Sequence, residues 1–260
     1  MASKVSLTSR IEILPDTTSL AQAAAEHFVT LAAQAIDARG RFAVALSGGS
    51  TPPSVHHRLS ETDCARRIDW PRVHIFWGDE RCVPPDHMDS NYRMACETLL
   101  DRVPIPTGNI HRLRGEIEPA AAEAAYAQEL HAFFAQPCDS AIPAAEVPWP
   151  RFDLIFLGLG EDGHTASLFP GTTALFEQKR WVVAHYVTQL QTWRITLTLP
   201  VINAAAQVTF MVAGERKAER LRQLLSASKE AADLPAHLVK PTTGELLWLV
   251  DAEAASRLKK

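Results

Sequence analysis

Glycines frame an acid and an imidazole in the segment Gly-Leu-Gly-Glu-Asp-Gly-His at 158–164, which follows the apolar run 152–157. A neutral imidazole has a pKa near 6.5 and can accept a proton from water at neutral pH. Glycine lets backbone and substrate approach each other closely. The segment therefore predicts that His164 acts as a general base.

The same glycines also match GxGxxG, the fingerprint of dinucleotide-binding proteins. That fingerprint requires a full helix after its third glycine, but Pro170 and Gly171 end any helix within about two turns. It also requires an acidic residue about twenty positions later, and the run 181–187 contains none. The sequence disfavours nicotinamide binding.

A second glycine-rich turn, Ser-Gly-Gly-Ser-Thr-Pro-Pro at 47–53, follows another apolar run. The N–H groups of Gly48 and Gly49, the hydroxyls of Ser47 and Ser50, and a helix N-terminus opened by proline suit a phosphate monoester. The Gly-Lys-Ser/Thr ending of a nucleotide P-loop is missing, as is the GxSxG context of a hydrolase nucleophile. Taken alone, the segment is also compatible with a plain tight turn.

The elements that must position these turns follow an α/β pattern, in which short apolar runs alternate with longer amphipathic stretches. The pattern predicts strands at 42–46, 73–77, 152–157, 181–186, 195–199, 208–212 and 246–250, and helices at 16–37, 91–100, 119–135 and 215–225. Four prolines indicate that 136–150 is an exposed connection. We expect one α/β domain over 1–260, with a mainly parallel sheet and helices on both faces.

Ligands bind beyond the carboxyl ends of parallel strands, so the polar residues that follow several strands should share one crevice. Asp79 and Arg81 follow the second predicted strand, and Asn91 opens the next helix. Arg194 and Lys217 are candidate counter-charges for a phosphate. Each of these cations alone would be read as a solvated surface residue.

Composition limits the classes of partner. The chain has 260 residues, of which 47% are apolar and 22% charged, and a net charge of -4 with no basic face for nucleic acid. No apolar run approaches the roughly 18 residues of a membrane span, and the start lacks the apolar core of a signal peptide. We expect a soluble, cytoplasmic protein that acts on a small molecule.

Candidate metal ligands are sparse. Four cysteines, at 64, 82, 96 and 138, show no zinc-binding spacing and are read as free thiols. His56 and His57 are read as surface histidines, since no third ligand lies at a suitable spacing. No metal is expected.

Four motifs together resemble those of the glucosamine-6-phosphate isomerase/6-phosphogluconolactonase family, and specifically those of its lactonases. They are Leu-Ser-Gly-Gly-Ser-Thr-Pro at 46–52, Trp-Gly-Asp-Glu-Arg at 77–81 with Ser-Asn-Tyr-Arg at 90–93, the block 158–171, and Arg-Ile-Thr-Leu-Thr-Leu-Pro-Val-Ile-Asn at 194–203. Their order and spacing match along nearly the whole chain.

The resemblance implies a sugar-isomerase-like, three-layer fold and hydrolysis of 6-phospho-D-glucono-1,5-lactone in the pentose phosphate pathway, without a metal or an organic cofactor. It implies that His164 is the base, that Asp162 and Asp79 are its polar surroundings, and that the phosphate site comprises Ser47, Gly48, Gly49, Ser50, Arg194 and Lys217. Arg81 and Asn91 fall in matching motifs as substrate-binding candidates. A monomer is favoured.

Two alternatives stay open. Glucosamine-6-phosphate deaminases share the glycine-rich turn that corresponds to 47–53 and a Gly-His turn. Their sequence at the second turn is similar to Gly-His-Ile-x-Phe-Asn-Glu-Pro, which places a glutamate five residues after the histidine. In this sequence that position is Phe169. A phenyl ring cannot transfer protons. The other alternative, a non-catalytic sugar-phosphate sensor, would have little need for a glycine-framed histidine.

Overall fold

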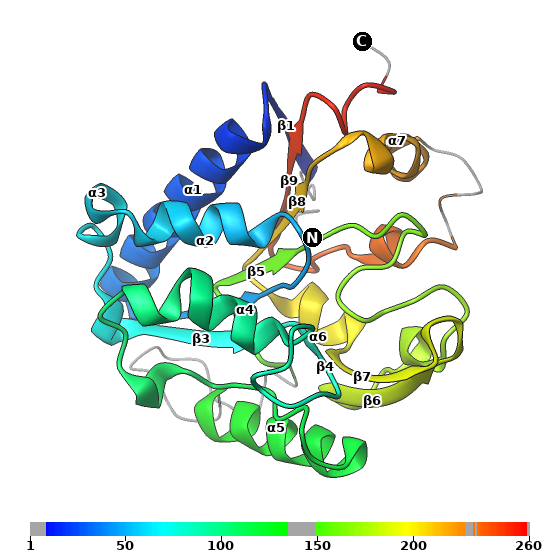
Figure 1. Ribbon diagram of the computed structural model, residues 1–260, viewed down its shortest axis with the longest axis horizontal. Coiled ribbons are helices and arrows are strands. Elements are labelled where there is room, and N and C mark those ends of the chain that lie inside the picture. The colour runs from blue at the N-terminus through cyan, green and yellow to red at the C-terminus, as the bar shows by residue number, and fades with distance from the viewer. Residues whose placement is uncertain (1–8, 135–148, 227–230, 232, 259–260) are drawn as a thin grey trace, which may run out of the picture.

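Six parallel strands form the central sheet in the order β1-β9-β8-β5-β2-β3 (Figure 1). The computed structural model describes residues 9–134, 149–226, 231 and 233–258. The strands are β1 (Ser9–Leu14), β2 (Phe42–Leu46), β3 (Val73–Trp77), β5 (Leu154–Leu157), β8 (Gln207–Val212) and β9 (Glu245–Asp251).

Both faces of the central part of this sheet are buried, which explains why the inner strands β2 and β5 are unbroken apolar runs. Successive side chains of a strand point to opposite faces. In β2, Phe42, Val44 and Leu46 enter one core, while Ala43 and Ala45 enter the other.

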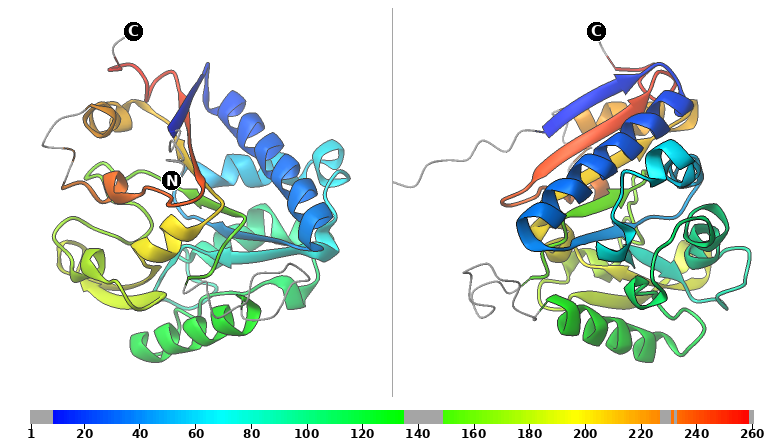
Figure 2. Two further views of the ribbon diagram at one scale, coloured as in Figure 1. Left: turned by 180° about the vertical axis from the view of Figure 1, so that it is seen from behind. Right: turned by 90° about the vertical axis from the view of Figure 1, so that its left-hand side faces the viewer.

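Helices cover the two faces of the sheet and complete three layers. One core contains side chains of α1 (Thr17–Arg39), α2 (Pro52–Ser60), α3 (Thr62–Ala65) and α4 (Asn91–Thr98). The other contains side chains of α5 (Pro119–Phe134), α6 (Leu199–Ala204) and α7 (Ala218–Leu225). The edge strand β1 and helix α5 lie at opposite ends of the molecule in each view (Figure 2).

A second sheet of three antiparallel strands belongs to the α5 side of the molecule. It consists of β4 (Asp79–Arg81), β7 (Thr192–Leu197) and β6 (Val182–Val187), in that order. The sequence pattern placed the runs 181–186 and 195–199 among parallel strands, which is wrong for these two. Only the short turn 188–191 joins them, whereas a parallel crossover needs a dozen or more residues.

The remaining expected elements are confirmed, with small shifts at their ends. Helix α1 begins after Asp16, whose side chain accepts a hydrogen bond from the N–H of Ser19 at 2.7 Å, and it ends at Gly40 in the left-handed region. Strands β1 and β4 were not predicted. Most of the expected connection 136–150 lies outside the described residues.

Candidate active site

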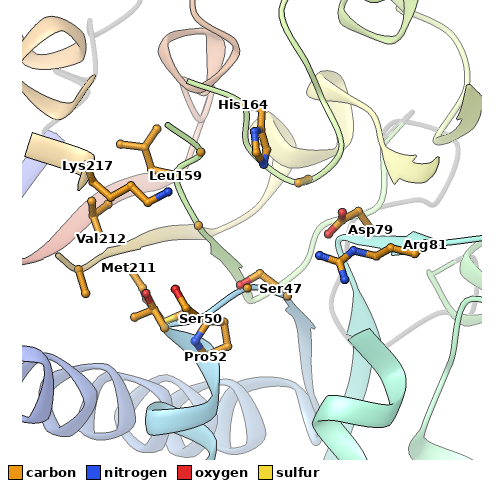
Figure 3. Close-up of a pocket in the computed structure, with 17 residues that line it drawn as sticks. Ser47, Ser50, Pro52, Asp79, Arg81, Leu159, His164, Met211, Val212 and Lys217 are labelled. Atoms are coloured by element: carbon orange, nitrogen blue, oxygen red, sulfur yellow. The ribbon is translucent and has the colours of Figure 1, made fainter. Parts of the chain in front are cut away.

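A cavity lies beyond the carboxyl ends of the central strands, where the strand order reverses. Strand β2 pairs with β3 on one side and with β5 on the other, and such a reversal opens a crevice between the loops that follow the two neighbouring strands. A cavity of about 180 Å³ occupies this position (Figure 3). Eight of the predicted site residues line it: Ser47, Gly48, Gly49, Ser50, Asp79, Arg81, His164 and Lys217.

The imidazole of His164 points into this cavity from the turn after β5 (Figure 3). The turn is closed by two hydrogen bonds, from the N–H of Gly160 to the carbonyl of His164 (2.8 Å) and from the N–H of Gly163 to the carbonyl of Gly160 (3.0 Å). An added Cβ at position 160 would stand 2.1 Å from Nδ1 of His164, so only glycine leaves the ring where it lies. Phe169 packs over the ring at a centroid distance of 4.3 Å.

Asp162 orients the imidazole without lining the cavity. Its Oδ1 lies 2.5 Å from Nδ1 of His164 and also accepts the backbone N–H of His164 at 3.0 Å. Burial alone would raise the pKa of Asp162, but the hydrogen bonds from the ring and the amide of His164 outweigh it and lower the pKa. The carboxylate can only accept, so Nδ1 carries the proton and Nε2 is left as the basic nitrogen.

The turn after β2 forms the wall below His164 in Figure 3 and presents hydrogen-bond donors. Ser47 is only 5% exposed, and its Oγ has no hydrogen-bond partner in the described part of the protein. A buried hydroxyl without a partner is costly unless a ligand or water satisfies it. Gly49 adopts φ +101°, which favours glycine.

Asn91 supports this turn from behind rather than lining the cavity. Its side chain is so close to Gly48 that an added Cβ on the glycine would meet Oδ1 at 1.9 Å. Its Nδ2 donates to the carbonyl of Asp79 at 2.9 Å, which fixes the Asn91 side chain against β4. The predicted substrate contact of Asn91 is not visible in the cavity wall.

Strand β4 explains how Asp79 and Arg81 reach the cavity together, since residues two apart on a strand face the same side. Asp79 is 6% exposed, and its Oδ2 accepts a hydrogen bond from Oγ of Ser167 at 2.5 Å. Nη1 of Arg81 donates to the carbonyl of Asp89 at 2.5 Å.

Glu80, between them, points the other way and was missed as a functional support. Its carboxylate accepts the N–H groups of Arg81 (2.9 Å), Asn91 (2.8 Å) and Tyr92 (2.8 Å) and the hydroxyl of Ser90 (3.2 Å). Burial raises the pKa of Glu80, and the hydrogen bonds from the three backbone N–H groups partly offset the rise. The sequence offered a signal for this role, because Glu80 lies between two predicted site residues and a predicted helix begins shortly after it, at Asn91.

The two predicted counter-charges are placed differently. Lys217 lines the cavity and directs its amine inward, on the side opposite Arg81 (Figure 3). Arg194 is not among the lining residues; it lies opposite Arg81 in the β4–β7 register and donates to Oγ1 of Thr192 at 3.1 Å. Burial, followed by the positive charge of Arg81, lowers the pKa of Arg194.

Other candidate groups lie away from this site. His56 is 2% exposed and bonds Oγ1 of Thr98 at 2.8 Å, so reading it as a surface histidine was wrong. Within the described residues, no three His, Cys, Asp or Glu side chains are arranged to hold a metal ion. No helix in that part of the chain is long and apolar enough to cross a membrane.

Comparisons with known proteins agree with this architecture. Residues 15–248 match the family model described as glucosamine-6-phosphate isomerases/6-phosphogluconolactonase. A 6-phosphogluconolactonase of Nostoc sp. is 41% identical over 249 residues, which cover 95% of this chain and 98% of that protein. The structure of a 6-phosphogluconolactonase from Trypanosoma cruzi superposes with a TM-score of 0.84 at 26% identity, covering 98% of this chain and 99% of that one.

A monomeric glucosamine-6-phosphate deaminase of the NagB superfamily also superposes, with a TM-score of 0.76 at 18% identity, over 95% of this chain and 99% of that one. This likeness concerns the fold alone. The match to the family model and the identity to the Nostoc protein extend over nearly the whole chain. The chain belongs to the glucosamine-6-phosphate isomerase/6-phosphogluconolactonase family.

Proposed function

We propose that the protein hydrolyses 6-phospho-D-glucono-1,5-lactone to 6-phospho-D-gluconate, a reaction of the pentose phosphate pathway. The observation that carries the proposal is the placing of one oriented imidazole and one anion-seeking turn in the walls of the same cavity. The names of relatives that match over nearly the whole chain support the same substrate.

In the proposed mechanism, His164 acts first as a base and then as an acid. Nε2 takes a proton from water as the water oxygen attacks C1 of the lactone, which gives a tetrahedral oxyanion. The imidazolium then returns the proton to the ring oxygen as the C1–O bond breaks. Asp162 stabilises the imidazolium through Nδ1. Proton transfer from a placed group contributes about 100 to 10,000-fold in rate.

Binding in this proposal depends on the phosphate. The Ser47 hydroxyl, the N–H groups of the turn and the amine of Lys217 supply donors and positive charge in the cavity wall. A well-placed hydrogen bond to a charged group is worth about 1.5 to 3 kcal/mol, or roughly 10 to 150-fold in affinity. Asp79 and Arg81 also line the cavity, with Arg81 on the side opposite Lys217 (Figure 3).

The deaminase alternative requires an acid near the histidine at the position of Phe169. Here a phenyl ring packs against the imidazole instead, and it cannot move protons. The sensor alternative gives no role to the hydrogen bond between Asp162 and His164.

Two assays on the purified protein separate these functions. Acid release from freshly prepared lactone, measured against an enzyme-free blank because the lactone hydrolyses spontaneously, should rise well above the blank. Ammonia release from glucosamine 6-phosphate should be absent. Ammonia release without lactone hydrolysis would establish the deaminase, and tight binding of a sugar phosphate with neither reaction would establish the sensor.

A further inference from the structure

Ser167 joins the turn that carries His164 to all three strands of the antiparallel sheet. It is 1% exposed and is not among the residues that line the cavity. Its N–H donates to Oγ1 of Thr196 on β7 at 3.3 Å, and its carbonyl accepts from Nε2 of His185 on β6 at 2.7 Å. Its hydroxyl donates to Oδ2 of Asp79 on β4 at 2.5 Å.

The backbone around Ser167 is held in an uncommon conformation. The N–H of Leu168 bonds the carbonyl of Thr165 at 2.9 Å, which closes a tight turn, and Ala166 within it has φ +47°. A residue other than glycine at positive φ is strained and persists only where its surroundings determine it. Ala166 lines the cavity, so the bonds that hold Ser167 also fix part of the cavity wall.

The histidine behind Ser167 has one defined tautomer. A carbonyl oxygen only accepts, so Nε2 of His185 carries the proton. Its Nδ1 is buried and has no hydrogen-bond partner in the described residues. Burial lowers the pKa of His185. Nε2 donates to the Ser167 carbonyl whether or not Nδ1 is also protonated.

The hydroxyl of Ser167 connects the turn that carries His164 to the carboxylate of Asp79. A hydroxyl hydrogen bond to a carboxylate is short and strong, and 2.5 Å lies at the short end of that range. Asn91 reaches Oδ1 of the same carboxylate only at 3.5 Å. The direction in which Asp79 faces the cavity therefore depends chiefly on Ser167.

We propose that Ser167 is a positioning residue, which sets the Asp79 carboxylate relative to His164 through its buried hydroxyl. The inference rests on the proposed lactone hydrolysis. The Ser167 hydroxyl does not line the cavity and donates to Asp79, so removing the hydroxyl alone should act on the reaction through Asp79. The phosphate turn and Lys217 contribute other parts of the wall, so substrate binding should change little when the hydroxyl is removed.

A double-mutant cycle tests this dependence. Ser167→Ala should lower kcat about 10-fold, the lower end of what a hydrogen bond to a charged group provides, with KM unchanged within about twofold. In an Asp79→Asn background, the same substitution should lower kcat by less than about threefold, because a neutral acceptor forms a weaker bond. Enzyme concentration is raised until each rate exceeds the blank.

The matched control is Thr198→Val, which removes another fully buried hydroxyl, bonded to the carbonyl of Arg180 at 2.8 Å and outside the site. It should lose thermal stability and keep kcat within about twofold. Three outcomes would overturn the inference and leave the proposed function standing. They are an equal loss of kcat in both backgrounds when the Ser167 hydroxyl is removed, a change in KM alone, and no change at all. Absence of lactone hydrolysis by the unmutated protein would remove the proposed function, and the inference with it.

Discussion

The close approach of Gly160 to the His164 ring gives the sharpest mutational prediction. An added Cβ at this position would stand 2.1 Å from Nδ1 and 2.3 Å from Cε1 of His164, and 2.7 Å from Oδ1 of Asp162. Ordinary contact begins near 3.4 Å, so the ring has to retreat by about 1.3 Å in Gly160→Ala. The side chain of His164 is 33% exposed, so it can move without unfolding its surroundings.

Such a displacement should separate the imidazole both from Asp162 and from its place in the cavity. A misplacement of about 1 Å at a reacting group can cost on the order of 100-fold in rate. We therefore expect kcat of Gly160→Ala to fall by at least about 100-fold, toward the value of a variant that lacks the imidazole. The substitution does not alter the turn 47–53, which we propose binds the phosphate, so KM should change by less than about threefold.

The assay is initial-rate acid release from freshly prepared lactone, corrected for spontaneous hydrolysis, with thermal unfolding measured in parallel. Gly108→Ala is the matched control, because an added Cβ there meets nothing within 4 Å and its backbone is not at positive φ. The control should keep full activity. If Gly160→Ala retained kcat within about threefold with an unchanged melting temperature, the position of the ring would not govern the reaction.

Two further predictions concern binding and stability. Lys217→Ala should raise KM about 10 to 150-fold with kcat largely spared. Arg194→Ala should raise KM several-fold less, because Lys217 lines the cavity and Arg194 does not. Steady-state kinetics on both variants measure these shifts, and equal shifts in KM would contradict the prediction. Burial lowers the pKa of His56 to about 3 and that of His27 to about 4, so the unfolded chain, in which histidine titrates near 6.5, binds protons first as the pH falls. The contribution of each ring to stability is complete above pH 6.5 and should decline by about 1.4 kcal/mol per pH unit from there toward pH 4. Denaturant unfolding at pH 7, 6 and 5 measures this slope, and His56→Gln should make it shallower; an unchanged slope would count against the buried, neutral ring.

The central sheet was predictable because its strands bury both faces. Strands β2 and β3 were predicted to the residue, since a short run that is apolar apart from His74 and is bounded by turn residues has little freedom in where it ends. The edge strand β1 was missed because it is largely exposed and alternates apolar with polar residues. The convergence of Ser47, His164 and Lys217 followed from one rule, that parallel strands end at one edge.

The second sheet could not be predicted from the local sequence pattern. Strand β4 has three polar residues and exists only through its pairing with β7, more than a hundred positions away, where Asp79 lies opposite Thr196. Without that register, Arg194 could not be placed beside Arg81, nor could Ser167 be connected to Asp79. The contacts that join the His164 turn to the second sheet are therefore long-range contacts, which a single sequence does not display.

In the proposed function, one imidazole, oriented by Asp162, activates water in the cavity that would bind the phosphate. The most direct measurement is kcat of His164→Ala for lactone hydrolysis above the enzyme-free blank, with the fold checked by circular dichroism. We expect a loss of about 100 to 10,000-fold, with KM nearly unchanged. A correctly folded variant that turns over at close to the unmutated rate would contradict it.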